Sequence, residues 1–138
     1  MPLRLFKSAG GVGAIADDVN GAGAAIFDDV TFNGSTGEVR EVGMFLRNAD
    51  PIKQYQGIIF SLVDNDPTLQ VTNFRLALTQ SGLSTAVDGA PVSVPNIPAA
   101  NPSPVDVALF IRCTIAVATV VGSFTGIKFK TSSIELPA

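Results

Sequence analysis

Apolar and polar positions alternate most strictly over residues 105–117 of the chain. Seven apolar side chains occupy every second position there: Val105, Val107, Leu109, Ile111, Cys113, Ile115 and Val117. Six residues lie between them: Asp106, Ala108, Phe110, Arg112, Thr114 and Ala116. Successive side chains of a β-strand point to opposite faces, so this period of two predicts a long strand with one buried face.

Two earlier stretches show the same alternation. Residues 38–48 carry Val42, Met44 and Leu46 on one face and Glu41, Phe45 and Arg47 on the other. Residues 56–63 carry Ile58, Phe60 and Leu62 on one face. Each stretch ends at a cluster of the turn-forming residues Asp, Asn and Pro, so we expect two further strands.

The remaining strand signals are weaker. Residues 26–32 and 69–79 are rich in β-branched and apolar residues, so each is expected to form a strand. We expect residues 124–130 to turn back and pair with residues 105–117, with Phe129 facing the core. A last short strand is expected to close the edge of the sheet near the end of the sequence.

These elements predict an all-β fold. No window longer than about ten residues has a helical period. Six to eight strands separated by turns predict two packed antiparallel sheets, a β-sandwich of the immunoglobulin-like or the jelly-roll kind. The 138 residues suffice for one domain and not for two. We assign residues 25–138 to the sandwich and residues 1–24 to an extended N-terminal arm.

The assignment of an arm depends on the composition of the first residues. A short apolar stretch, Pro2 to Phe6, is followed by a run of Gly, Ala and Asn up to Ala25. A glycine-rich segment loses much conformational entropy when it becomes ordered and has few apolar groups to bury in return. We therefore expect an arm that lies on another molecule, with a frayed terminus as the alternative.

A second unusual segment covers residues 80–104, which contain five prolines and two glycines. Proline cannot donate a hydrogen bond to a strand ladder, so most of this segment is expected to be loop, polyproline II or sheet edge. A loop of this length is typical of a binding loop or of a segment that lies over a neighbouring subunit.

The charge and the residue types exclude several classes of function. The net charge is −3 and the chain has no electrostatic footprint for nucleic acid. It contains no His and a single Cys, which removes the commonest general base, the commonest metal ligand and any internal disulfide. We therefore expect a protein that is not an enzyme, with no cofactor and no metal.

Two motifs resemble ligand sites, and each has a simpler explanation. The run from Gly11 to Ala16 matches a dinucleotide fingerprint, which requires a preceding strand and a following helix, but glycines interrupt the residues after it. Asp64-Asn65-Asp66 resembles the start of a calcium loop but lacks the remaining ligands. Flexible backbone and turn formation explain the two motifs better.

Cys113 and two arginines are the remaining candidates. Cys113 lies between isoleucines on the apolar face of its predicted strand, which favours a buried, unreactive thiol. Arg47 and Arg112 each lie on the less apolar face of a strand, beside a phenylalanine. They could pair with acids on adjacent strands, contribute to a subunit interface, or lie along the sheet surface.

The start of the chain imitates a signal peptide, but its apolar part is mostly Gly and Ala. The longest uncharged stretch without proline, residues 113–127, is shorter than the roughly 18–20 residues of a membrane span. We therefore expect an uncleaved, soluble intracellular product that has no membrane partner.

Low charge points to association with other proteins. Only 15% of the residues are charged, and the mean hydropathy is +0.38. Charged residues are depleted at the centre of protein interfaces, so such a surface is suited to subunit contacts. Nine Phe, one Tyr and no Trp form an aromatic set typical of a core rather than of a sugar-binding platform.

Several stretches resemble small virion proteins of tailed bacteriophages. The first runs from Val42 to Asp50, with the sequence VGMFLRNAD, and the second runs from Tyr55 to Phe60, with the sequence YQGIIF. In those proteins a strand that ends in an RN-x-D turn precedes a second strand of an immunoglobulin-like or jelly-roll sandwich. Residues 105–115 and 124–130 are similar to the closing strands of such domains.

The resemblance implies a non-enzymatic capsid decoration (cement) protein that binds the outer surface of a phage head. Its partners would be further copies of itself, with a trimer as one option, and the major capsid protein or other virion proteins. Its location would be the virion, assembled in the host cytoplasm. The arm around Leu3, Leu5 and Phe6 would lie over capsid subunits, and its removal would leave the sandwich folded.

Three alternatives remain open from the sequence. The chain could be a component of a phage tail or baseplate, which would require the same fold. It could be a ligand-binding sandwich that grips a glycan or a peptide with residues 80–104, although these contain no Phe, Tyr or Trp. An enzyme is the third alternative, and the few acid and base groups of the chain make it the weakest.

Overall fold

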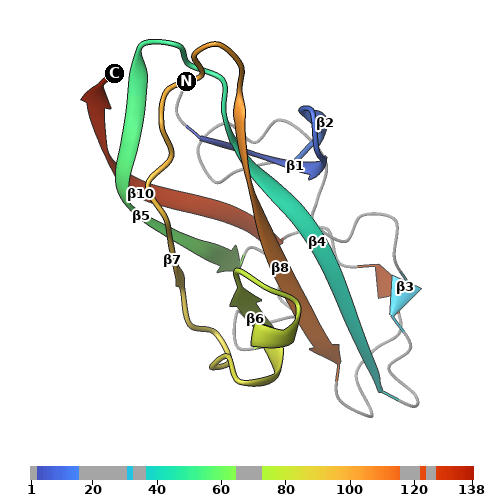
Figure 1. Ribbon diagram of the computed structural model, residues 1–138. Helices are drawn as coiled ribbons and strands as arrows, with labels where there is room; N and C mark the ends of the chain where they lie inside the picture. The colour runs from blue at the N-terminus through green and yellow to red at the C-terminus, as the bar shows by residue number, and fades with distance from the viewer. Residues whose placement is uncertain (1–2, 16–30, 33–36, 65–72, 116–121, 124–126) are drawn as a thin grey trace.

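The computed structural model describes residues 3–15, 31–32, 37–64, 73–115, 122–123 and 127–138. Their regular structure is almost entirely β, in two antiparallel sheets that pack face to face (Figure 1). The predicted all-β sandwich is therefore confirmed.

The larger sheet has five strands in the order β2-β1-β4-β8-β6. They are β1 (Arg4–Ser8), β2 (Val12–Ala14), β4 (Glu38–Asn48), β6 (Phe74–Ala77) and β8 (Val105–Ile115). The central strands β4 and β8 are paired along their whole length, from Glu38 opposite Ile115 to Asn48 opposite Val105. Met44, Leu46, Leu109 and Ile111 are buried on one face, as the alternation predicted.

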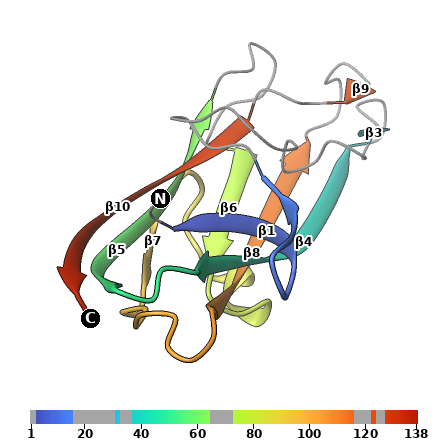
Figure 2. The same cartoon turned by 90° about the horizontal axis from the view of Figure 1, so that it is seen from above.

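The smaller sheet has three strands in the order β10-β5-β7. They are β5 (Lys53–Asp64), β7 (Val92–Val94) and β10 (Ile127–Pro137). A separate short pair joins β3 (Thr31–Phe32) to β9 (Gly122–Ser123). The two main sheets enclose the core between them, as the turned view shows (Figure 2).

A β-bulge in β5 bends the smaller sheet around the core. Between Ser132 and Ile134 the pairing moves two residues along β10 but three along β5. Gly57, with a φ of 57°, provides the left-handed backbone conformation that such a bulge favours. Because of the extra residue, Tyr55 and Ile58 are both buried although they lie three positions apart. The bulge coincides with the shared curvature of β5 and β10 (Figure 1).

Aromatic stacking joins the two long strands of the smaller sheet inside the core. The rings of Phe60 on β5 and Phe129 on β10 have centroids 5.6 Å apart and planes 11° apart. Both side chains are at most 1% exposed. The predicted inward direction of Phe60 and Phe129 is therefore confirmed, and their burial removes a large apolar area from water.

Asn48 is the one polar residue among the fully buried side chains of the described part of the chain. Its Nδ2 donates to the carbonyl oxygens of Lys53, at 3.0 Å, and Pro98, at 2.9 Å. Its Oδ1 accepts a hydrogen bond from the backbone N–H of Asp50 at 3.0 Å. One side chain thus connects the end of β4, the start of β5 and the proline-rich segment.

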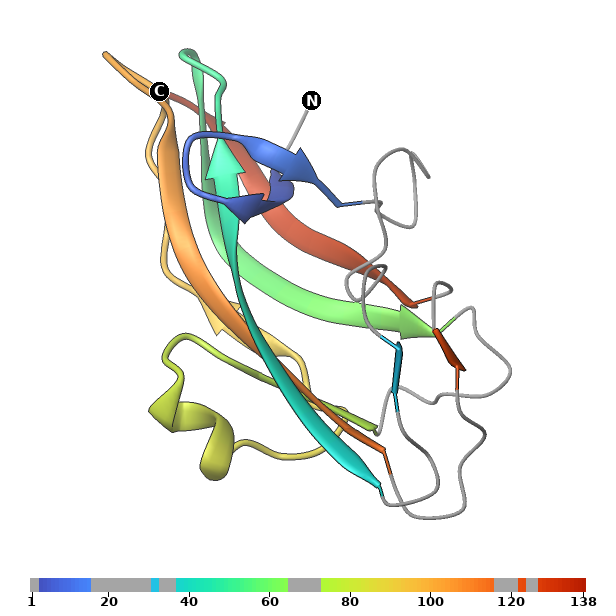
Figure 3. The ribbon, with the colours of Figure 1, turned by 90° about the vertical axis from the view of Figure 1, so that its right-hand side faces the viewer.

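The expectation of an extended arm is wrong for residues 3–15. β1 pairs with β4, with Leu5 opposite Leu46, and the hairpin of β1 and β2 lies against β4 (Figure 3). Leu3, Leu5 and Ile15 are at most 2% exposed and belong to the core. Three buried apolar side chains compensate the entropy cost that the glycines impose. The expected boundary between residues 24 and 25 lies outside the described residues.

The predicted pairing of residues 124–130 with β8 is also wrong. β8 is already flanked by β4 and β6, whereas β10 pairs with β5 in the other sheet. A hairpin is the simplest connection between consecutive strands, but the inward faces of β10 and β5 complement each other through Phe129 and Phe60. β10 also runs on to Pro137, so the predicted closing strand is its second half.

The proline-rich segment is built into the sandwich. It contains a short 3-10 helix, η2 (Ser81–Ser84), and the edge strand β7, which agrees with the prediction of loop and sheet edge. Leu83, Val94 and Ile97 are at most 5% exposed. The backbones of Ile97 and Tyr55 exchange two hydrogen bonds of 2.9 Å. These apolar anchors pack on the chain's own core, so they are not available to a neighbouring subunit.

Two predicted strands lie partly outside the described residues. Of residues 26–32 only β3 is described, and of residues 69–79 the structure shows β6 followed by a bend. The predictions for 38–48 and 56–63 are confirmed by β4 and β5.

Replacing Leu5 by Ala should lower the free energy of unfolding by about 2–5 kcal/mol, because a buried leucine is removed from the core. Val12→Ala, on the same hairpin but 62% exposed, should change it by less than about 0.5 kcal/mol. Urea unfolding followed by circular dichroism measures both. Equal, small effects of the two substitutions would restore the arm.

Asn48→Ala should lower the free energy of unfolding by about 2–4 kcal/mol, because the buried Asn48 side chain and its three part-buried hydrogen bonds, to two carbonyl groups and one N–H, are lost. Asn96→Ala, at an exposed position of the segment that Asn48 anchors, is the matched control and should be nearly neutral. Chemical denaturation of the two variants compares them directly. A neutral Asn48→Ala would show that the connection is dispensable.

A candidate binding surface on the five-stranded sheet

The outer face of the five-stranded sheet is unusually aromatic. The register places Phe6 of β1 opposite Phe45 of β4, and Phe45 opposite Ala108 of β8. Two residues further along the strands, on the same face, Phe110 of β8 lies between Gly43 of β4 and Ala77 of β6. Phe6, Phe45 and Phe110 are half-buried, and we call them the aromatic strip. A solvated face of an antiparallel sheet is ordinarily polar, so this strip departs from the expected pattern.

The aromatic ring of Phe110 covers a glycine on the neighbouring strand. Its Cε1 lies 3.1 Å from the position that a Cβ atom on Gly43 would occupy. An aromatic side chain packed over a cross-strand glycine shields a backbone that would otherwise be open to water. The absence of a side chain at Gly43 therefore lets Phe110 lie flat on the sheet.

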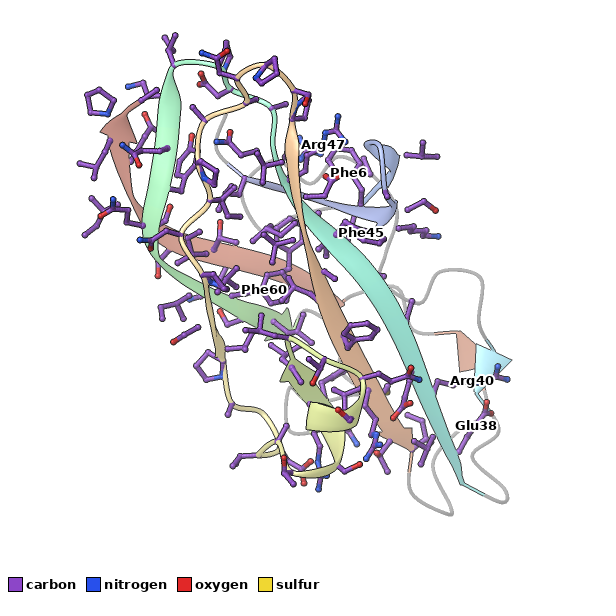
Figure 4. The ribbon with its side chains drawn as sticks, in the orientation of Figure 1. Phe6, Glu38, Arg40, Phe45, Arg47 and Phe60 are labelled. Atoms are coloured by element: carbon purple, nitrogen blue, oxygen red, sulfur yellow. The ribbon has the colours of Figure 1, made fainter. Side chains whose placement is uncertain are left out.

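At one end of the strip, Arg47 and Asp106 form a cross-strand ion pair. Arg47 Nη1 lies 3.2 Å from Asp106 Oδ2, and the side chains are 17% and 22% exposed. The backbone N–H of Gly10 also donates to Asp106 Oδ2, at 3.3 Å. The turn between β1 and β2 thus folds onto this ion pair, and Figure 4 shows Phe6, Phe45 and Arg47 together where β1 meets β4.

Glycines make this close approach of the turn possible. A Cβ atom on Gly11 would lie 3.3 Å from the guanidinium carbon of Arg47, and Gly10 and Gly11 have φ values of 84° and 77°. The motif at Gly11–Ala16 therefore begins in this turn and forms β2. No helix is present within its described residues. The backbone arrangement that a dinucleotide phosphate requires is not formed there.

Among the described residues, this end of the surface carries two arginines, Arg4 and Arg47, beside the carboxylate of Asp106. Arg4 lies directly opposite Arg47 in the register of β1 and β4, whereas Asp106 is the carboxylate that pairs with Arg47. Arg4 Nε is buried and has no hydrogen-bond partner in the structure. Like charges on directly opposed residues of two strands repel each other, so an additional carboxylate would be favoured at this position.

A second group of ion pairs lies at the other end of the strip. Arg112 Nη2 lies 2.6 Å from Glu41 Oε2, and Gln80 Nε2 donates to Glu41 Oε1 at 3.2 Å. The hydrogen bond from Arg112, followed by the one from Gln80, lowers the pKa of Glu41. Beside this pair, Arg75 Nε lies 2.6 Å from Asp88 Oδ1. Exposed pairs of this kind add little stability, but they fix the orientation of the arginines.

Both arginines singled out in the sequence therefore pair with acids on an adjacent strand. Sequence reasoning did not identify the partners Asp106 and Glu41, nor the aromatic strip as a unit. The alternation did contain a signal for both, because odd positions of residues 38–48 and even positions of residues 105–115 share one face. Only the register between β4 and β8, which the sequence does not give, shows which of these residues lie opposite each other.

The other candidate groups do not form a reactive site. Cys113 is fully buried, and burial, followed by the charge of Glu38, raises the pKa of its thiol to about 12. Such a thiol stays protonated near neutral pH and is a poor nucleophile. The calcium-like run Asp64-Asn65-Asp66 falls largely outside the described residues.

Metal ligands and membrane-spanning helices were the remaining features to consider in the described residues. No group of three or more His, Cys, Asp or Glu side chains there could hold a metal ion. No helix there has the length and apolar character needed to cross a membrane.

A smaller polar cluster lies on the other sheet. Glu135 of β10 lies 3.0 Å from Lys53 Nζ and accepts a hydrogen bond of 3.1 Å from the hydroxyl group of Tyr55. Burial, and then the hydrogen bond to Glu135, raise the pKa of Tyr55 to about 12. The hydrogen bonds from Lys53 and then Tyr55 lower the pKa of Glu135.

Stability should decrease in alkali as the pH rises above 9. The unfolded chain releases the protons of Cys113 and Tyr55 near pH 9.0 and 10.0, whereas the folded chain holds both until about 12. The unfolded state therefore binds fewer protons between these values, and the free energy of unfolding falls with pH. The chain has one Tyr and no Trp, so tyrosinate absorbance reports Tyr55 alone.

We expect this absorbance to rise near pH 12 or together with unfolding. A rise near pH 10 in the folded protein would contradict the burial of the hydroxyl group. Tyr55→Phe should make the alkaline loss of stability less steep, which urea unfolding at several pH values measures.

Comparison with known proteins adds no template for this surface. No protein-family model, no curated protein and no solved structure matches the chain. The aromatic strip and its flanking ion pairs are therefore interpreted from their own geometry.

Proposed function

We propose that the chain is a non-enzymatic structural subunit, a capsid decoration (cement) protein on the outer surface of a tailed-phage head. The resemblance of residues 42–50 and 55–60 to small virion proteins supports the class. The observation that carries the proposal is the aromatic strip on the outer face of the five-stranded sheet. Aromatic residues and Arg are enriched in protein interfaces, where a few of them carry most of the binding energy.

The contact with the capsid is assigned to this surface rather than to an arm. Leu3 and Leu5 are enclosed in the sandwich core, so they cannot lie over capsid subunits. The strip instead offers three half-buried rings held on a rigid sheet, which lose little entropy when they bind. Arg4 and Arg47 lie opposite each other at one end of the strip, which favours a partner that places a carboxylate there.

Decoration would work through repetition. A single strip of three aromatic side chains provides a small contact, but a capsid presents many equivalent sites in fixed positions. Repeated contacts between linked subunits raise the overall affinity above that of one site. Two antiparallel sheets packed on one core resist bending, so each bound subunit would stiffen the shell at its position.

The first experiment labels intact particles from the source lysate with gold-conjugated antibodies against the chain and views them by electron microscopy. Label distributed over the heads is expected. Label on the tails alone would assign the chain to a tail or baseplate, and free protein with unlabelled particles would overturn the virion proposal.

The second experiment tests the strip itself. Phe45→Ser should weaken binding to particles that lack the protein by at least about tenfold, because a central aromatic contact is lost. Ile59→Ser, on the outer face of the other sheet, is the matched control and should bind as the wild type does. Titration of bound protein in sedimented particles gives both affinities, and circular dichroism confirms that the variants are folded. Equal affinities of the two variants would exclude the strip as the contact.

A further inference from the structure

The two ion pairs at the ends of the aromatic strip run in opposite directions across the two long central strands (Figure 1). At one end the arginine, Arg47, lies on β4 and the carboxylate, Asp106, lies on β8. At the other end the carboxylate, Glu41, lies on β4 and the arginine, Arg112, lies on β8. Each strand therefore carries one positive and one negative side chain on the outer face, six positions apart.

The residues between these ion pairs on the same face are apolar or lack a side chain. On β4 they are Gly43 and Phe45, and on β8 they are Ala108 and Phe110. Gly43 and Ala108 are exposed, so the face is open to another molecule at these positions. An apolar centre with charged residues around it is the usual arrangement of a protein interface.

A second copy of this face matches the first when it is turned over about a two-fold axis that lies between the copies and runs across the strands. The axis passes over Met44 and Leu109, which lie opposite each other halfway between the ion pairs. β4 of one copy then lies antiparallel over β4 of the other, and β8 lies over β8. Sheets that pack face to face keep their strands nearly aligned and about 10 Å apart, so side chains at equal distances from the axis meet.

Opposite charges face each other in this arrangement. Arg47 of one copy lies over Glu41 of the other, and Asp106 lies over Arg112. Two-fold symmetry repeats both contacts, so all four charged positions of each copy meet the opposite sign. Arg4 lies one strand away from Arg47, so it also has Glu41 of the second copy as a neighbour. A second copy thus supplies a carboxylate where two arginines lie opposite each other.

The aromatic rings also meet in this arrangement. Phe45 of one copy lies over Gly43 of the other, and the ring of Phe110 covers that glycine. Phe45 of each copy therefore contacts Phe110 of the other, and the centre of both strips is removed from water.

The direction of the ion pairs selects this axis. A two-fold axis parallel to the strands would place β4 over β8, and opposite charges would then meet whichever way each ion pair ran. Only the axis across the strands requires the two ion pairs to run in opposite directions, as they do in this sheet.

We infer that two copies of the chain pack face to face through the outer faces of their five-stranded sheets, about a two-fold axis across β4 and β8 at Met44 and Leu109. The contact closes after two copies, so it predicts a dimer. The dimer does not depend on the proposed function. If both hold, the dimer is the form of the free protein, because a capsid site must displace the second copy to reach the aromatic strip.

Sedimentation equilibrium of the full chain tests this dimer with one ion pair reversed. The double variant Glu41→Arg with Arg112→Glu keeps an ion pair within each copy. Between copies, however, the introduced arginine faces Arg47 and the introduced glutamate faces Asp106. The dimer dissociation constant should rise about tenfold or more, because like charges now meet across the contact.

Reversal of both ion pairs is the matched control. Adding Arg47→Glu and Asp106→Arg to the double variant makes the two ion pairs run in opposite directions again, so the dimer should return. Circular dichroism checks that both variants are folded. Equal dissociation constants of the double variant and the four-residue variant would overturn the inference, and so would a wild type that stays monomeric up to millimolar concentration.

Salt provides a second measurement on the same proteins. Between roughly 0.05 and 0.5 M sodium chloride the dissociation constant of the wild type should rise, because screening weakens the attraction between the copies. That of the double variant should fall, because screening weakens a repulsion. A wild-type constant that falls with salt would also overturn the inference. None of these measurements uses virus particles, so the dimer and the virion assignment can fail separately.

Discussion

The hydrogen bonds of Asn48 hold the sandwich at the point where the chain changes sheet. β4 belongs to the five-stranded sheet and β5 to the three-stranded sheet, and only a few residues connect them. Asn48 binds the carbonyl oxygen of Lys53 at the start of β5 and that of Pro98 in the proline-rich segment. Asp50 continues the connection, because its carbonyl oxygen accepts the N–H of Ala100 at 2.8 Å. These few polar groups thus link the end of β4, the start of β5 and the proline-rich segment.

Local pattern was sufficient for the strands and their faces. The alternation in residues 38–48, 56–63 and 105–115 correctly identified β4, β5 and β8 and the side of each that is buried. Such a pattern arises from neighbouring residues, so it can be read from one segment at a time. It contains no information about which strands are partners, and for that reason β10 was assigned to β8 instead of β5.

The N-terminal segment shows a different limit. Its many glycines suggested a segment with few apolar groups to bury. The segment does have few of them, but three apolar residues are enough to order it on the sheet when all three reach the core. At the candidate surface, composition and alternation located Arg47 and Arg112, whereas the acids beside them depend on the register between strands. The bulge at Gly57 has a similar origin, since an added residue is defined only relative to a partner strand.

The stacking of Phe60 on Phe129 has a consequence for the order of folding. β4 is separated from β8 by a long stretch of chain, and β5 must wait for β10, which follows every other strand in the sequence. Contacts between distant segments slow folding, because a large loop closes before the contact forms. During synthesis the contact between Phe60 and Phe129 therefore cannot form until residues 127–137 have been made. The five-stranded sheet can be complete once β8 has been made, whereas the three-stranded sheet remains incomplete until β10 follows.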